Sequence, residues 1–191
     1  KMKTFSLKGT IRTDLGKKAA KAIRANDSIP CELYGNAENV HFTCTASAIR
    51  KLVYTPEIFV VDLDIDGKVC KAVMREIQFH PVSDKVMHID FLQVTEEKPI
   101  VMEVPVRLEG LAQGVRAGGK LSLDMRKLRV KALYNNIPEV LVINVENLDL
   151  GKTIQVRALQ FDNLEILNAP NAVVCAVKLT RAARGAQAKA N

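Results

Sequence analysis

FVVDLDIDGKVCKAVMREI, residues Phe59 to Ile77, is the stretch that decides the fold. On both sides of Asp66-Gly67 it alternates apolar and polar side chains, which is the period of a half-buried β-strand. An Asp-Gly pair between two such runs is the strongest short-range signal for a tight hairpin turn. The stretch therefore predicts two antiparallel strands in a sheet with one face toward a core.

A second hairpin is predicted directly after the first one. Its arms are Ala72 to Phe79 and Val86 to Val94, and between them lie the turn formers His80, Pro81, Ser83 and Asp84. Closer to the start of the chain, Thr4 to Arg12 also alternates at period two. The first half of the chain is thus expected to be mainly β.

The segment Val86 to Val94 carries polar groups on its outer face. Alternation predicts that Met87, Ile89 and Phe91 face the core. His88 and Asp90 then share the opposite face, and a hairpin that closes about Ser83 brings Gln78 directly across from His88. The pattern alone is also satisfied by an ordinary polar sheet surface.

Two segments interrupt the β pattern. Gly16 to Asn26 contains good helix formers, with Ala19, Ala22 and Ile23 spaced for one face. Thr45 to Val53 begins with a capping-type threonine and places Ile49, Leu52 and Val53 together. Both are predicted to be short helices within a β protein.

The charged, proline-terminated segment 96–99 has the composition of a linker, so we expect one domain over residues 1–95 and another over residues 100–180. The second domain is also expected to be β. Its predicted strands are Ile100 to Leu108, Leu128 to Leu133, Val140 to Val145, Thr153 to Val156 and Ala172 to Leu179. The alanine-rich, basic residues 181–191 are expected to form a disordered tail.

The positive charge is concentrated at the beginning of the chain. Residues 1 to 24 hold eight basic side chains and one acid, and the resulting +7 equals the net charge of all 191 residues. A local field of this kind favours a polyanion as partner, such as nucleic acid or an anionic membrane. Trp is absent and aromatic residues make up only 5% of the sequence. Structured RNA or DNA is therefore a better candidate than a single strand bound by stacked rings.

Several classes of protein receive no support from the sequence. The cysteines Cys31, Cys44, Cys70 and Cys175 form no CxxC pair, so neither a zinc knuckle nor a thioredoxin-type motif is present. The chain has no secretory h-region at its start and no stretch of about 20 apolar residues. We expect a cytoplasmic protein that has no metal, no cofactor and no membrane partner.

Catalytic motifs are also missing. None of the three histidines belongs to an HExxH or GxSxG pattern, and GVRAGGK (Gly114 to Lys120) lacks P-loop spacing and is expected to be a turn. One enzymatic alternative is a hydrolase or transferase that uses Cys31 as nucleophile and His88 as base. Nothing near Cys31 in the sequence would lower its thiol pKa.

Longer motifs resemble a known family. IRTDLGKKAAKAIRANDSIPCELYG (Ile11 to Gly35), followed by IQFHPVSDKVMHIDFLQV (Ile77 to Val94), is similar to the bacterial large-subunit ribosomal proteins that bind 5S rRNA, also called the general stress protein Ctc family. VPVRLEG (Val104 to Gly110), NNIPEVLVINV (Asn135 to Val145) and LDLGKTIQV (Leu148 to Val156) resemble the C-terminal β domain of its long members.

The resemblance implies a fold, a function and a set of partners. The fold would be an N-terminal six-stranded, barrel-like domain that binds the loop E region of 5S rRNA, followed by a C-terminal β domain. That second domain would contact neighbouring large-subunit proteins or rRNA. By motif position, the expected RNA-facing residues are Arg12, Lys17, Lys21, Tyr34, Gln78, His88 and Asp90. Lys18 and Arg24 are added on charge alone.

Different roles are expected within this set. The basic side chains suit phosphates, whereas Gln78, His88 and the Tyr34 hydroxyl can bond base edges or 2′-hydroxyls. Asp90 would be repelled by phosphate, so it is expected to accept a hydrogen bond from guanine or a 2′-hydroxyl, or to orient His88 or Arg12. The sequence differs from the commoner family pattern at Lys21, Ala22 and Glu32.

The interpretation we carry forward is a non-catalytic ribosomal protein with two β domains. A second alternative remains beside the enzyme described above. In that alternative the chain is a protein interaction module, a stress-related adaptor whose C-terminal β domain is the working surface.

Overall fold

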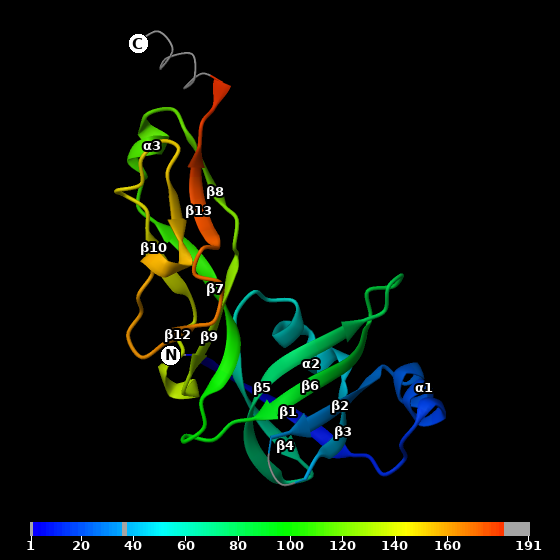
Figure 1. Cartoon of the computed structure of the whole chain (residues 1–191). Helices are drawn as coiled ribbons and strands as arrows, with labels where there is room; N and C mark the ends of the chain where they lie inside the picture. Colours follow the sequence, from blue (N-terminus) through cyan, green and yellow to red (C-terminus); the bar gives the residue numbers. More distant parts are fainter. Residues whose placement is uncertain (1, 36–37, 182–191) are drawn as a thin grey trace. The chain divides into compact units, whose positions relative to one another are not determined.

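The computed structural model describes residues 2–35 and 38–181 of the chain. The predicted basic tail lies, except for Arg181, outside the described residues. Within these residues strands dominate, and the three α-helices are short, so the expected mainly β fold is confirmed (Figure 1). No helix in the described part of the chain is both long enough and apolar enough to cross a membrane.

Six strands near the beginning of the chain close into a barrel. They are β1 (Lys3–Ile11), β2 (Ser28–Tyr34), β3 (Val40–Thr45), β4 (Phe59–Ile65), β5 (Lys68–Phe79) and β6 (Val86–Gln93). Their order around the barrel is β1-β3-β2-β6-β5-β4, and β4 returns to pair in parallel with β1. The six-stranded barrel that the family resemblance implies is confirmed.

The Asp66-Gly67 turn connects β4 to β5 as predicted. Both residues have positive φ, 48° and 86°, which is what a type I′ hairpin requires. Asp66 also contacts the end of β1, because its Oδ2 accepts a hydrogen bond from the backbone N–H of Ile11 at 2.9 Å. One turn thus fixes the hairpin and the end of β1 together.

The second hairpin, β5 with β6, is confirmed with two irregularities, one at Arg75 of β5 and one at Met87 of β6. Gln78 pairs with His88, but the next pair joins Phe79 to Val86, so Met87 has no partner opposite it. The skipped residue shifts the alternation by one position, as a β-bulge does. The prediction that Met87 faces the core is therefore wrong: Val86 is buried, and Met87 is half-buried. Phe79, the last residue of β5 and the partner of Val86, is exposed.

Aromatic rings fill the barrel interior. Phe42 and Phe91 are fully buried, and their ring centroids lie 5.7 Å apart. Gly9 makes room for Phe42, since a Cβ added to this glycine would lie 2.5 Å from Phe42 Cδ2. A small residue at Gly9 is therefore required by packing rather than by backbone conformation.

Two cysteines also belong to this core. Cys31 and Cys44 are buried, and their Sγ atoms lie 3.4 Å apart as free thiols. The hydrogen bond with Cys44 and the burial of the side chain both raise the pKa of the Cys31 thiol. Cys31 thus stays protonated at neutral pH, and the two cysteines pack as small hydrophobic side chains.

Both predicted helices of the first half are present. α1 spans Lys17–Ala25 and α2 spans Ala46–Val53. In α2, Ile49 and Leu52 are buried as expected. α1 has no buried residue, and Ala22 is exposed rather than part of an apolar face.

The second half of the chain forms two small sheets. One has the order β10-β7-β9-β12 and the other β11-β13-β8. Their strands are β7 (Ile100–Glu109), β8 (Lys120–Leu123), β9 (Lys127–Ala132), β10 (Leu141–Asn144), β11 (Thr153–Gln155), β12 (Glu165–Ile166) and β13 (Val173–Lys178). The short helix α3 (Gln113–Arg116) occupies part of the predicted GVRAGGK turn, and the 3₁₀ turns are η1 (Tyr134–Asn136) and η2 (Val156–Ala158).

The chain divides into two compact units, and the division is not a single point in the sequence. The first unit runs through Ile100 and also includes Leu133–Glu139, whereas the rest of the second half forms the other unit. Within the first unit, the Tyr134 hydroxyl donates a hydrogen bond to Glu96 Oε1 at 3.1 Å. Lys71 Nζ lies 5.7 Å from the centroid of the Tyr134 ring.

We expect Gly9→Ala to lower the free energy of unfolding by about 1–3 kcal/mol, because the added methyl group overlaps a buried ring. Urea denaturation measures this loss. A double-mutant cycle with Phe42→Leu provides the control. The double variant should lose less free energy of unfolding than the sum of the losses in the two single variants. Strict additivity of the two losses would contradict the packing explanation.

We also expect Cys31 and Cys44 to resist a thiol reagent in the native protein at neutral pH, because reaction needs an accessible thiolate. Cys70, which is half-buried, should react faster. Mass spectrometry of the labelled peptides measures this order, and labelling in denaturant provides the control in which all four thiols react. Rapid native labelling of Cys31 would contradict the assignment.

Candidate nucleic-acid interface

The outer face of the barrel carries a row of polar side chains at one level. His41 of β3 pairs with Glu32 of β2, which pairs with Asp90 of β6, which pairs with Glu76 of β5. The backbone N–H of Arg12 bonds the His41 carbonyl at 3.0 Å, so Arg12 lies at the end of this row. Closure of the barrel thus gathers residues from across the first 90 positions onto one surface, which we call the polar row.

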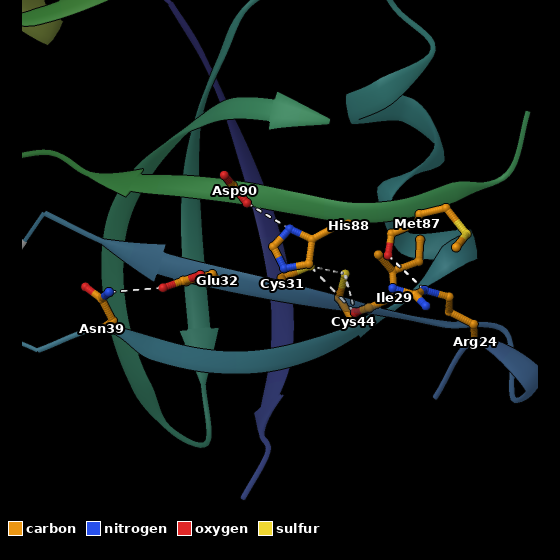
Figure 2. Close-up of polar contacts among 9 residues, drawn as sticks. All are labelled: Arg24, Ile29, Cys31, Glu32, Asn39, Cys44, Met87, His88 and Asp90. Carbon is orange, nitrogen blue, oxygen red and sulfur yellow. Dashed lines mark hydrogen bonds and ion pairs between the residues drawn. The ribbon is translucent and has the colours of Figure 1, made fainter. Parts of the chain in front are cut away.

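His88 and Asp90 form a hydrogen-bonded pair beside this row. Nδ1 of His88 lies 2.8 Å from Oδ1 of Asp90, and both side chains are about one quarter exposed, at 22% and 29% (Figure 2). A carboxylate can only accept, so Nδ1 carries the proton and donates it. This arrangement fixes the tautomer and leaves Nε2 of neutral His88 as an acceptor. The prediction that Asp90 could orient His88 agrees with this contact.

Gln78 lies where the sequence places it. It is directly across from His88 on β5, and its side chain is exposed. Tyr34 is the last residue of β2 and shares the outward face with Glu32, two positions away. Strand pairing therefore brings together Tyr34, Gln78, His88 and Asp90 on the outside of β2, β5 and β6.

Arg12 and His41 contain buried polar atoms that form no hydrogen bond with the described residues. Arg12 Nε, Arg12 Nη1 and His41 Nδ1 are buried and have no hydrogen-bond partner among the described residues. Buried polar groups in native proteins are nearly always bonded, and a missing partner calls for an explanation such as a ligand. The unmatched atoms lie beside the polar row.

The predicted basic residues of α1 divide into two kinds. Lys17, Lys18 and Lys21 are exposed on a helix that buries none of its residues. Arg24 is half-buried, and its Nε donates to the Met87 carbonyl at 3.1 Å (Figure 2). Arg24 thereby attaches α1 to β6, a role that charge alone did not reveal, whereas the three lysines remain free to contact a ligand.

The enzymatic alternative does not fit this geometry. Cys31 points into the core, its thiol is held protonated, and it neighbours Ile89 rather than His88 in the strand pairing. His88 faces outward and is bonded to Asp90. Within the described residues, no three side chains of His, Cys, Asp or Glu gather as a metal site.

Sequence reasoning missed three members of the polar row, namely His41, Glu32 and Glu76. In the sequence, His41 is one of three histidines without a catalytic motif, and Glu32 is a departure from the commoner family pattern. The alternation of β2 predicts that Glu32 faces outward. Its position beside Asp90 depends on a parallel pairing between β2 and β6, which no local pattern reveals.

Comparisons with known proteins match both halves of the chain. The model of the ribosomal L25p family matches residues 7–91, and that of the ribosomal protein TL5 C-terminal domain matches residues 99–181. A large ribosomal subunit protein bL25 from Porphyromonas gingivalis is 64% identical over 190 residues, which cover 98% of this chain and 99% of the relative. Another from Phocaeicola vulgatus is 60% identical over 196 residues and covers 99% of both.

These matches decide between the classes that the sequence left open. They support a structural, rRNA-binding role in the cytoplasmic ribosome and not an enzymatic one. The predicted family and ribosomal function are confirmed at that level. The chain therefore belongs to the ribosomal L25p family of large-subunit ribosomal proteins.

Proposed function

We propose that this chain binds the loop E region of 5S rRNA through the outer face of β2, β5 and β6 together with α1. The observation that carries the proposal is the outward His88–Asp90 pair at 2.8 Å with Gln78 in register beside it. These groups are partly exposed and oriented by one another, as an RNA-reading surface requires. The ribosomal family to which the chain belongs supplies the ribosome as the setting.

The shape of the surface suits a structured RNA. A-form RNA presents a wide, shallow minor groove that displays 2′-hydroxyls and base edges. The outer face of a barrel that carries polar side chains can lie against such a groove. In this proposal Gln78, His88 and Asp90 contact base edges and sugars, and the Tyr34 hydroxyl bonds a phosphate or 2′-hydroxyl.

Phosphate contacts are assigned to the basic side chains. Arg12 lies at the end of the polar row, and Lys17, Lys18 and Lys21 are exposed on α1. Arg24 contributes charge near the surface while its Nε stays bonded to β6. Such contacts raise affinity for any RNA without selecting a sequence.

The domain roles are part of the same proposal. Residues 1–95 form the RNA-binding domain, residues 96–99 a linker, and residues 100–180 a β domain that contacts neighbouring ribosomal proteins or rRNA. The match of residues 99–181 to a distinct C-terminal domain model supports a separate role for the second half.

The direct test is binding of the purified protein to isolated 5S rRNA, to 5S rRNA without loop E, and to an unrelated RNA duplex, at two salt concentrations. Tight binding that requires loop E supports the proposal. Equal affinity for all three RNAs would overturn it.

Asp90→Ala should lower the affinity for 5S rRNA by about tenfold and leave the affinity for the unrelated duplex nearly unchanged, because it removes an acceptor and releases His88. Fluorescence anisotropy measures the two affinities. Glu38→Ala, which removes an exposed carboxylate from the β2–β3 loop, provides the charge control. An unchanged ratio of affinities in Asp90→Ala would refute a role for Asp90 in specificity.

Lys17→Ala should weaken binding to every RNA to a similar extent, because a phosphate contact carries no sequence information. The slope of log affinity against log salt should become shallower by about 1. Titrations at several salt concentrations measure this slope. A loss confined to 5S rRNA with an unchanged slope would show that Lys17 does not act as a phosphate contact.

A further inference from the structure

Glu32 occupies a position that the stability of the barrel does not explain. It is the direct partner of Asp90 across the parallel pair β2 and β6, so two carboxylates lie side by side on the outer face. Glu76 continues the row on the other side of Asp90. Like charges at neighbouring positions of a sheet repel one another. Among the described residues Glu32 forms no ion pair that would offset this repulsion.

Each of the two carboxylates is held by one neutral or weakly basic neighbour. Oε1 of Glu32 accepts a hydrogen bond from Asn39 Nδ2 at 3.0 Å, and Oδ1 of Asp90 accepts from His88 Nδ1 at 2.8 Å (Figure 2). A carboxylate has two acceptor oxygens, so one oxygen of each group is fixed and the other remains for a ligand. Glu32 thus repeats, on the next strand, the arrangement that orients Asp90.

The end of the same row lacks acceptors. His41 is the partner of Glu32 on β3, and its Nδ1 is unmatched, as are Nε and Nη1 of the adjacent Arg12. The row therefore combines free acceptors at Glu32 and Asp90 with unmet polar groups at Arg12 and His41. An RNA strand offers donors that bond such free acceptors, whereas the unmatched atoms of Arg12 and His41 are buried and become reachable only if their side chains move.

We propose that Glu32 is a further specificity-determining residue, which accepts a hydrogen bond from a donor in the RNA minor groove beside the site of Asp90. This inference rests on the proposed function and extends it by one strand. Carboxylates are repelled by phosphates, so the partner has to be a donor on a base or sugar. In the minor groove the donors are the guanine amino group and the 2′-hydroxyl.

The test uses the sign of the effect of Glu32→Gln in the full-length protein. Glutamine keeps one acceptor oxygen, which Asn39 occupies, and turns an NH2 group toward the RNA donor. If Glu32 accepts a hydrogen bond, the variant should therefore bind 5S rRNA about tenfold more weakly, while its affinity for an unrelated duplex stays equal or rises. If Glu32 only repels RNA, the same variant should bind both RNAs more tightly. Glu38→Gln removes an equal charge from the neighbouring loop and reports the purely electrostatic effect.

The two possible donors are separated by changing the RNA. Guanines of loop E are replaced one at a time by inosine, which lacks the amino group, and nucleotides of the same loop are replaced by their 2′-deoxy forms. One of these changes should weaken the wild-type protein but not Glu32→Gln, and its kind identifies the donor. Circular dichroism melting of the variants checks that the fold is unchanged.

The outcomes distinguish this inference from the proposed function. If the wild-type protein does not discriminate 5S rRNA from the duplex, the proposed function fails. If it discriminates and Glu32→Gln binds 5S rRNA as tightly as Glu38→Gln, only the inference fails. The same conclusion follows if every RNA change weakens wild type and Glu32→Gln equally.

Discussion

Closure of the six-stranded barrel is the constraint on which the rest of the structure depends. In a closed sheet each strand has two partners, so the register of every strand is fixed on both sides. Inward positions are then filled by Leu63, Phe42 and Phe91, which are fully buried. Outward positions of strands that are far apart in sequence come to lie at the same level. The polar row is a direct product of this closure.

In the proposed RNA-binding surface, electrostatic attraction and hydrogen-bond selection are assigned to different elements. Exposed lysines lie on α1, which buries none of its residues, whereas the acceptors lie on a sheet whose positions are fixed by backbone pairing. Long-range attraction needs charge but little geometry, and hydrogen-bond selection needs geometry within a fraction of an ångström. Arg24 joins the two parts through its bond to the Met87 carbonyl. That carbonyl belongs to the bulge residue that the β5–β6 pairing skips.

Much of the fold could be predicted from local patterns. The Asp-Gly turn, both hairpins, the two helices of the first half and the Gln78–His88 pair follow from alternation and turn chemistry. The bulge at Met87 could not be predicted, because it depends on how two strands fit around a crowded core. The parallel pairing of β2 with β6 also could not be predicted from local patterns, so the sequence alone did not predict that Glu32 lies beside Asp90. In the second half, β12 has only two residues, too few to give a periodic signal, and β8 directly follows the segment that was expected to be a turn.

The assignment of Leu133–Glu139 to the first unit has a consequence for the order in which the chain folds during its synthesis. A nascent chain emerges from its N-terminus, and a contiguous domain can complete itself as soon as its last residue is free. Here the barrel strands end at Gln93, but Tyr134 reaches Glu96 only after a further stretch of the second half has been made. The first unit therefore reaches its final state while β7, β8 and β9 are already present. Premature release of the chain after the barrel would leave this unit without its last contact.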